Sequence, residues 1–315
     1  MRDHGQKAMY LQLDKNLKIV PTELSFDAIF NSELPNSDLC FSFESKFEPY
    51  QKYASDDIGG IDLVVKSKSG DFLRPLEIKL TVLPDSGTSH KKESMWGSEL
   101  VIRPATTKYC ALGIADSCFS HLDEIRSRFE PIGMDMQDWA NAVEISTKIE
   151  SMLQCIDSFE QGYLNHQKPV LLQPIWKTHG QSPMLADQAF DIFVWSDFAL
   201  TRLFLDAAWE KRNAKKLTRQ IRSSARFFRF MYQMATSRKV MLSRIYSEMT
   251  FKLQTDKEFA VNGSITNKYM KSPRLLSPLL PSEIVPKIIL NGGEELLKPE
   301  RRFDQTLYFT AKEKI

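Results

Sequence analysis

The chain has 315 residues, of which 42% are hydrophobic and 26% charged, a balance typical of a globular protein large enough for one elaborated domain or two. Its formal net charge is only +2, so a surface for nucleic acid would have to come from the placement of charges and not from their total. The N-terminus is polar, and no apolar run approaches the length of a membrane span. These features argue against a secreted or membrane protein, and we expect a cytoplasmic one.

The N-terminal fifty residues contain a candidate strand and a candidate short helix. Leu11 to Val20 is consistent with a strand or an extended arm. Ser25 is a candidate N-cap for a short helix, although Pro21 and Thr22 would also serve. Cys40 is the first of four cysteines that show neither a CxxC pair nor the spacing of a disulfide framework, which favours reduced thiols.

A β-hairpin is the most informative prediction. Two apolar runs, 57–66 and 72–80, are joined by a short polar turn that contains Gly70. Side chains alternate along a strand, so Glu77 and Lys79 point to one face of the second run while its apolar side chains point to the other. The pattern therefore places a carboxylate beside an ammonium group.

Asp62 is the one acid in an otherwise apolar stretch of the first run. Burying a carboxylate without a partner costs several kcal/mol, and a divalent cation would neutralise Asp62 and Glu77 together. Both are hard oxygen donors of the kind that Mg²⁺ prefers. A metal held by Asp62, Glu77 and the backbone carbonyl of Ile78 would activate water, and Lys79 could orient that water against a phosphodiester. The alternative is an ordinary solvated strand face.

An acid followed after some fifteen residues by Glu-x-Lys on a hairpin resembles the PD-(D/E)xK nuclease core. The flanking segments Gly59-Gly60, 77–85 and 98–104 are similar to those of HindVP-type restriction endonucleases, a branch of that superfamily. Ile61 stands where the superfamily signature has the proline of Pro-Asp, which is a departure from it.

The resemblance implies an α/β (α+β) fold with a central mixed β-sheet flanked by helices, and helical and loop elaborations around it. It also implies a bacterial, Mg²⁺-dependent type II endonuclease that cuts double-stranded DNA as a homodimer at a short palindromic site like GRCGYC, with a cognate DNA methyltransferase as its genetic partner. Asp62, Glu77 and Lys79 match the acid, acid and lysine of the family. Because an acid on a preceding helix often completes the metal site in this superfamily, Glu44 is a further candidate ligand, with a solvated helix face as the alternative.

After the hairpin, the polar loop that carries Lys91 and Lys92 is a candidate clamp for a DNA backbone, or an ordinary surface loop. Leu100 to Ile102 predicts a core strand ending at Arg103, which could grip a phosphate or pair with Glu99. Tyr109 to Ala115 fits either a strand or the start of a helix.

The middle of the chain predicts helices around a pair of strands. Apolar residues recur at three and four from Asp135 to about Leu164, which predicts the longest helix. Strands follow at 169–176 and 189–195, and Ser196 can cap a helix that runs to Trp209.

A basic block comes next. Between Lys211 and Ser247 there are eleven Lys and Arg residues and no acid. Several of them recur at three and four and predict one basic helical stripe for the DNA backbone; membrane-surface or calmodulin-like binding is the alternative. The stripe comprises Arg212, Lys215, Lys216, Arg219, Arg222, Arg226 and Arg229.

The absence of repeats and of a clear linker predicts a single endonuclease domain over 1–315. Its catalytic core would span about 40–115, helical and DNA-binding elaborations about 120–250, and a loop-rich C-terminal segment 251–315. Two other functions stay open: a repair or recombination nuclease with the same core, and a non-catalytic DNA-binding protein in which Asp62, Glu77 and Lys79 form a buried ion-pair network.

Overall fold

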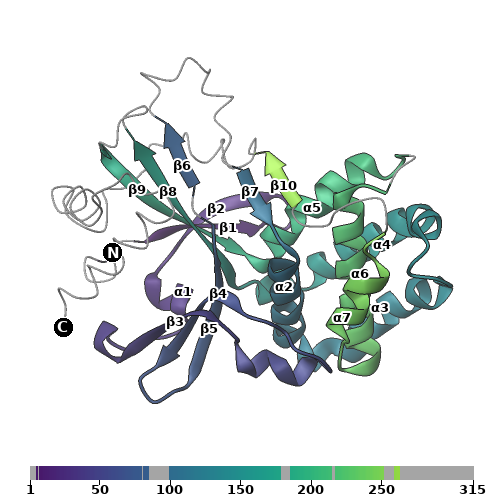
Figure 1. Cartoon of the computed structure of the whole chain (residues 1–315), viewed down its shortest axis with the longest axis horizontal. Helices are drawn as coiled ribbons and strands as arrows, with labels where there is room; N and C mark the ends of the chain where they lie inside the picture. Colours follow the sequence, from purple (N-terminus) through teal and green to yellow (C-terminus); the bar gives the residue numbers. More distant parts are fainter. Residues whose placement is uncertain are drawn as a thin grey trace.

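A mixed β-sheet forms the centre of the molecule (Figure 1). The computed structural model describes residues 5, 7–79, 81–84, 99–178, 185–214, 217–251 and 259–262. Within them, one sheet has eight strands in the order β2-β1-β9-β8-β5-β4-β3, and β6 also pairs with β8. The strands are β1 (Ala8–Leu13), β2 (Ile19–Leu24), β3 (Leu39–Ser45), β4 (Ile61–Ser67), β5 (Phe72–Ile78), β6 (Thr81–Pro84), β8 (Pro169–Thr178) and β9 (Leu185–Ser196).

Strands β5 and β6 lie one after the other along β8. Both pair with it in parallel, with Glu77 opposite Leu171 and Thr81 opposite Ile175. Between them, the backbone N–H of Lys79 donates to the carbonyl of Leu172 at 2.9 Å. Lys79 therefore stands at the junction of the two strands. A separate two-stranded sheet is formed by β7 (Glu99–Ile102) and β10 (Phe259–Asn262).

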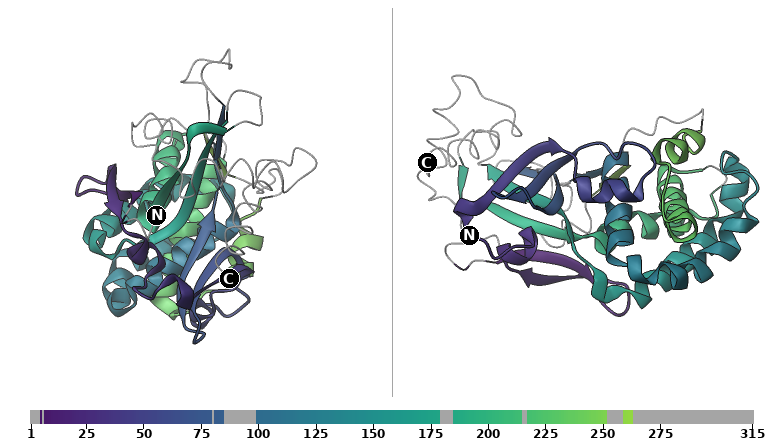
Figure 2. Two further views of the ribbon diagram at one scale, coloured as in Figure 1. Left: turned by 90° about the vertical axis from the view of Figure 1, so that its left-hand side faces the viewer. Right: turned by 90° about the horizontal axis from the view of Figure 1, so that it is seen from below.

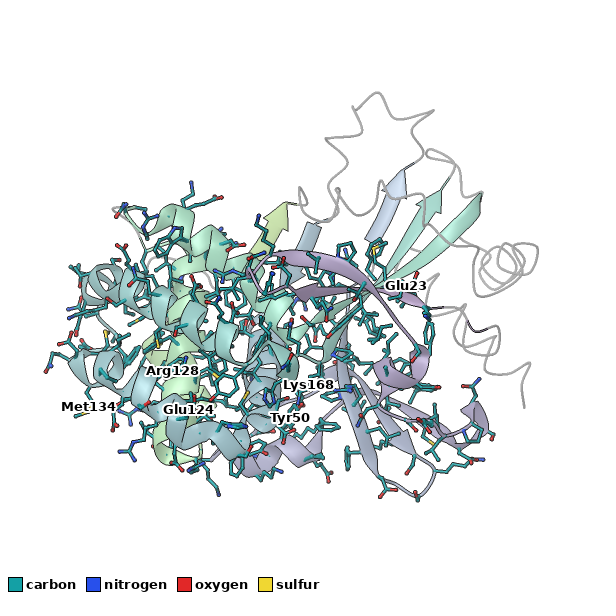
Figure 3. The ribbon with its side chains drawn as sticks, turned by 180° about the vertical axis from the view of Figure 1, so that it is seen from behind. Glu23, Tyr50, Glu124, Arg128, Met134 and Lys168 are labelled. Carbon is teal, nitrogen blue, oxygen red and sulfur yellow. The ribbon has the colours of Figure 1, made fainter. Side chains whose placement is uncertain are left out.

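The helices α2 to α7 gather at one end of the molecule, and the long strands extend away from them (Figures 1 and 2). Seen from behind, Tyr50 and Lys168 lie where the two parts meet (Figure 3), with the Lys168 ammonium 5.5 Å from the centre of the Tyr50 ring. The helices are α1 (Phe26–Phe30), α2 (Pro104–Ser117), α3 (Leu122–Asp135), α4 (Ala142–Gly162), α5 (Asp197–Lys211), α6 (Arg219–Ser237) and α7 (Leu242–Glu248).

The core is divided between the two faces of the sheet. Val64 belongs to a large apolar cluster shared with α2 to α7, while its neighbour Val65 belongs to a smaller one with Phe26 and Ile29 of α1. Successive side chains of a strand point to opposite faces, which explains this division. The side of the sheet that carries the helices is therefore the one with the larger core.

The fold class and most of the predicted elements are confirmed. The central mixed sheet is flanked by helices, β4 and β5 form the predicted hairpin, and β8 and β9 are the two predicted strands. Ser25 and Ser196 both cap helices, each accepting a backbone N–H with its hydroxyl. The 109–115 segment is helical, in α2. All four cysteines are free thiols.

Two predicted boundaries are wrong. The predicted longest helix is confirmed as α4, which with 21 residues is the longest of the described helices, but it begins at Ala142 and not at Asp135. The side chain of Asn141 accepts the N–H groups of its first turn, and α3 ends at Asp135. The segment from Leu11 to Val20 contains the turn between β1 and β2. Among the residues that the structure describes, no helix is long and apolar enough to span a membrane.

Candidate active site

Strands β4 and β5 bring the predicted acids together. Leu63 is opposite Leu76 in this antiparallel pair, so Asp62 and Glu77 are neighbours across it. Asp62 is oriented by the backbone of the next strand, because its Oδ2 accepts the N–H of Ile78 at 2.8 Å. The hairpin thus holds both carboxylates on rigid strands, as a preorganised site requires.

Lys79 joins the two carboxylates. Its ammonium donates a hydrogen bond to Glu77 Oε1 and lies 3.6 Å from Asp62 Oδ2. The side chains of Lys79 and Asp62 are 18% and 29% exposed, so the cluster opens to solvent on the side of these two residues. The structure therefore brings both predicted catalytic acids to the ammonium of the predicted catalytic lysine.

Glu77 is the deepest member of the site, with only 4% of its surface exposed. Thr106, in the first turn of α2, donates a hydrogen bond of 2.8 Å to Glu77 Oε1. Burial penalises the charged form and raises the pKa of Glu77; the neighbouring Lys79 ammonium opposes this effect, while Asp62 adds to it. A further cation beside Glu77 would therefore stabilise its charged form.

The chemistry of this donor set fits a divalent metal ion. Two carboxylates converge on one cationic group, and both are hard oxygen ligands. Within the described ranges, no group of three or more His, Cys, Asp or Glu side chains has metal-binding geometry. Mg²⁺ needs only one or two carboxylates and takes its other ligands from water and phosphate, so Asp62 and Glu77 suffice.

Glu44 is on a strand and not on a helix, which corrects the prediction for this residue. It belongs to β3, where Phe43 and Ser45 pair with Leu63 and Ile61, so it is level with Asp62. Its φ of 48° is left-handed, a conformation that costs energy for a residue with a side chain. Glu44 is exposed beside the site, and its role as a ligand stays a prediction.

The residues predicted to contact DNA are partly at the surface, partly buried and partly outside the described residues. Arg103 is exposed at the N-terminus of α2, which also carries Thr106. Arg212 lies at the end of α5, with its guanidinium 4.2 Å from the Trp209 ring centre, and Arg219 is exposed at the start of α6. Lys91, Lys92, Lys215 and Lys216 lie outside the described residues.

The prediction of one basic surface stripe is wrong. Arg212 is the C-cap of α5, separate from α6, and Arg222, Arg226 and Arg229 are only 0%, 4% and 3% exposed. Arg226 donates to the carbonyl of Met249 at 2.6 Å. Arg229 pairs with Glu248 at 2.5 Å and lies 5.1 Å from the Trp139 ring centre. The planar guanidinium suits such buried pairs and stacks, so this face of α6 packs inside the helical end.

Two contributors to the site had no signal in the sequence. Thr106 and Tyr109 are buried on α2, and only the fold brings that helix against the hairpin. The Tyr109 hydroxyl donates to the carbonyl of Gly59 at 2.8 Å and accepts the N–H of Phe47 at 3.1 Å. It thereby fixes the turn that leads into Asp62.

The fold and this site define a restriction-endonuclease-like protein. Residues 1–313 match the family described as HindVP restriction endonuclease. The chain is 34% identical to the type II restriction enzyme HgiDI of Herpetosiphon aurantiacus, over 96% of this chain and 84% of that protein. It is 30% identical to the probable type II restriction enzyme HindVP of Haemophilus influenzae, over 99% of this chain and 84% of that protein. No solved structure matches.

The chain therefore belongs to the HindVP restriction endonuclease family and is an enzyme of the type II, site-specific deoxyribonuclease class.

Proposed function

We propose that this enzyme hydrolyses phosphodiester bonds of double-stranded DNA in a Mg²⁺-dependent reaction centred on Asp62, Glu77 and Lys79. The observation that supports it is the contact of both carboxylates with one ammonium group at the end of β5. Family membership makes the substrate DNA, and the donor set makes Mg²⁺ the fitting cation.

Each residue has a distinct role in this proposal. Asp62, Glu77 and the carbonyl of Ile78 hold the metal, which when bound supplies Lewis-acid activation of water; Glu44 is a further candidate ligand. Lys79 orients the attacking water and stabilises the negative charge that develops on the phosphate. Asp62 is held in position by the N–H of Ile78, so its carboxylate needs little rearrangement.

We further propose that the enzyme cuts a short palindromic site, GRCGYC or one like it. A symmetric site cut in both strands requires two active sites related by a two-fold axis, so a homodimer is expected. The proposal includes a cognate DNA methyltransferase that protects the host genome, a bacterial cytoplasmic location, and a single endonuclease domain. Arg103, Arg212 and Arg219, with Lys91, Lys92, Lys215 and Lys216, are candidates for contacts with the DNA backbone.

Digestion of a plasmid of known sequence tests the proposal. Purified protein is incubated with Mg²⁺ or with EDTA, beside the Asp62→Ala and Lys79→Ala variants, and the fragment ends are sequenced. Discrete fragments that require Mg²⁺ and are lost in both variants are the expected result, and their ends give the recognition site. A smear of fragments would favour a nuclease without sequence specificity. An intact but gel-shifted plasmid would mean that Asp62, Glu77 and Lys79 form a structural ion-pair network.

A further inference from the structure

A lysine that belongs to no predicted site lies beside the turn that leads into Asp62. Lys108 is half-buried on α2, two residues after Thr106. A Cβ atom added to Gly59 would lie 3.9 Å from the Lys108 Nζ, so the ammonium faces the bare Cα of this glycine. Gly59 has a φ of 73°, which favours glycine and keeps this side of the turn open.

The two acids that precede the turn are bonded to other groups. Asp56 accepts the N–H groups of Leu242 and Ser243 at 2.8 and 2.6 Å, at the start of α7. Asp57 pairs with the Lys46 ammonium at 2.7 Å and accepts the N–H of Gly59 at 2.9 Å. Burial raises the pKa of Asp56, but these bonds outweigh burial and hold this pKa below its usual range. At Asp57 the two bonds, with smaller contributions from the charges of Lys46 and Lys108, also hold the pKa below its usual range.

Lys108 itself has no ion pair within the described part of the chain. There its Nζ lies 5.7 Å from the centre of the Tyr246 ring. Burial lowers the pKa of Lys108, and the charges of Asp56 and Asp57 oppose this effect without forming an ion pair with it. A half-buried ammonium without a direct ion pair is costly, and an anionic ligand in contact with it would relieve that cost.

We propose that Lys108 and the Gly59–Gly60 turn form a binding site for a DNA phosphodiester that flanks the scissile one. The inference rests on the proposed function and adds a backbone contact to it. Gly59 is three residues before Asp62, so the two are at most about 10 Å apart along the chain. Successive phosphates of one strand rise by about 3.4 Å along the helix axis, which puts this site within a few phosphates of the catalytic acids.

The α2 helix is suited to couple this contact to catalysis. The same helix supports Glu77 through Thr106 and fixes the Gly59 carbonyl through Tyr109. Helix α2 would therefore hold a phosphate bound at Lys108 at a fixed distance from Asp62 and Glu77. Positioning of the scissile bond requires such a fixed distance.

The salt dependence of DNA binding tests the proposal. Binding of a duplex that carries the cleavage site is measured in EDTA and in Ca²⁺ at several salt concentrations, for wild type, Lys108→Met and Lys108→Arg. For Lys108→Met we expect affinity roughly tenfold weaker and a log–log salt slope smaller by about one, and we expect Lys108→Arg to restore most of both. Lys66→Met is the control, because Lys66 also lies over a ring, 4.1 Å from the centre of Phe72, at the far end of β4.

Wild-type protein gives a second readout that does not depend on a variant folding. Lysines are acetylated with and without excess duplex in EDTA, and peptides are quantified by mass spectrometry. Protection of Lys108 by DNA supports the site. Equal acetylation in both samples, or an unchanged salt slope in a folded Lys108→Met, overturns it. Failure of wild type to bind or cut any DNA would instead overturn the proposed function.

Discussion

The hydroxyl of Thr106 donates a hydrogen bond of 2.8 Å to Glu77 Oε1, the same oxygen that accepts from Lys79. Helix α2 therefore supports the most buried acid of the site directly. Since β4 and β5 supply the acids and α2 supplies their support, the proposed catalytic centre depends on the packing of the helical end against the sheet.

Replacing Thr106 with valine should impair catalysis more than folding. A hydrogen bond to a charged group contributes about 1.5–3 kcal/mol, so we expect kcat to fall roughly tenfold to a hundredfold and half-saturation to need more Mg²⁺. Thr107→Val is the matched control, because this buried neighbour donates to the Arg103 carbonyl at 3.4 Å. Equal kinetic effects of the two substitutions, measured on a mapped duplex, would contradict the support role of Thr106.

Replacing Glu77 with glutamine should abolish cleavage and raise the metal-free melting temperature. Burial raises the pKa of Glu77 in the folded protein, so the folded state binds the proton more tightly than the unfolded state does. The charge therefore costs stability at neutral pH, and this cost disappears as pH falls through the raised pKa. We therefore expect a higher Tm for Glu77→Gln than for wild type in thermal melts at pH 7.5 in EDTA, and a Tm at or below that of wild type would contradict this cost.

The position of Glu77 in the proposed metal site also predicts that Mg²⁺ stabilises the folded protein. Mg²⁺ at ten times its Kd should stabilise wild type by about 1.4 kcal/mol and leave Glu77→Gln nearly unchanged. Thermal melts with and without Mg²⁺ measure this without any DNA. If neither Mg²⁺ nor Ca²⁺ changed the Tm of wild type, binding of the metal by Asp62 and Glu77 alone would be contradicted. A metal site that is completed by DNA would then be indicated.

Replacing Arg229 with methionine should destabilise the fold but leave the salt dependence of DNA binding unchanged. Arg229 is 3% exposed and paired with Glu248, which keeps Arg244 as a second partner, so loss of this charged hydrogen bond should cost about 1.5–3 kcal/mol. Exposed Arg219 is the comparison: Arg219→Gln should change stability far less and reduce the salt slope if it contacts a phosphate. Urea denaturation and a binding titration distinguish the two arginines.

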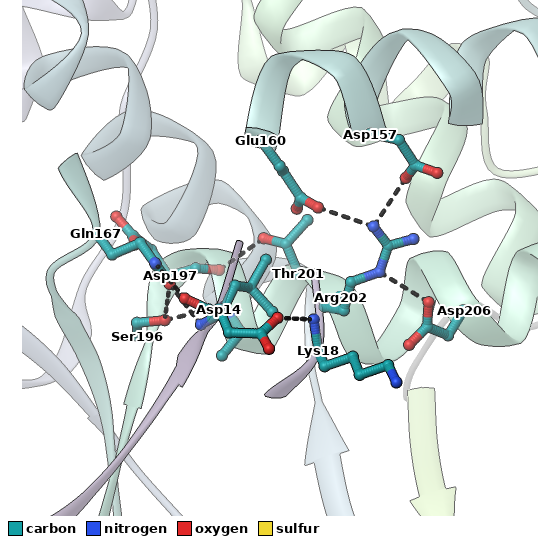
Figure 4. A network of polar contacts seen from close by, with 12 residues as sticks. Asp14, Lys18, Asp157, Glu160, Gln167, Ser196, Asp197, Thr201, Arg202 and Asp206 are labelled. Atoms are coloured by element: carbon teal, nitrogen blue, oxygen red, sulfur yellow. Dashed lines mark hydrogen bonds and ion pairs between the residues drawn. The ribbon is translucent and has the colours of Figure 1, made fainter. Parts of the chain in front are cut away.

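A buried ion-pair network among the helices predicts a substitution whose cost in stability depends on pH. Arg202 lies between three acids (Figure 4), at 2.8 Å from Asp157, 3.0 Å from Glu160 and 2.7 Å from Asp206. Burial raises the pKa of Glu160 to about 8, although Arg202 opposes this effect.

Arg202→Met removes the cation and should cost about 3–5 kcal/mol at pH 9. The cost should be smaller at pH 6, because folded Glu160 can then take up a proton that the unfolded chain binds less tightly. Asp206→Asn, which alters the 54%-exposed acid of the network, should cost far less at either pH. A loss for Arg202→Met that does not depend on pH, in urea denaturation, would contradict this account.

The hairpin was predictable from the sequence because its information is local. Alternation in β5 places Glu77 and Lys79 on one face, and the isolated acid at Asp62 in an apolar strand requires a partner. The position of Thr106 and Tyr109 was not predictable, since nothing in their own segment shows which strands α2 packs against.

The basic stripe, in contrast, was predicted wrongly because the local pattern does not show whether a helix face is exposed. Spacing at three and four marks one face of a helix but does not distinguish an exposed face from a covered one. The partners of Arg226 and Arg229 are the Met249 carbonyl and the Glu248 carboxylate, immediately beyond the acid-free segment that suggested a DNA surface. Their contacts depend on how α7 folds back on α6, which no local pattern contains.

The most direct test of the catalytic centre is the single-turnover cleavage rate of Lys79→Met on a duplex with the mapped site. We expect a rate at least a hundredfold below wild type with DNA affinity in Ca²⁺ retained, while Lys66→Met, on the same hairpin, stays near the wild-type rate. A folded Lys79→Met enzyme that cuts within threefold of wild type would contradict the assignment of Asp62, Glu77 and Lys79 as the active site.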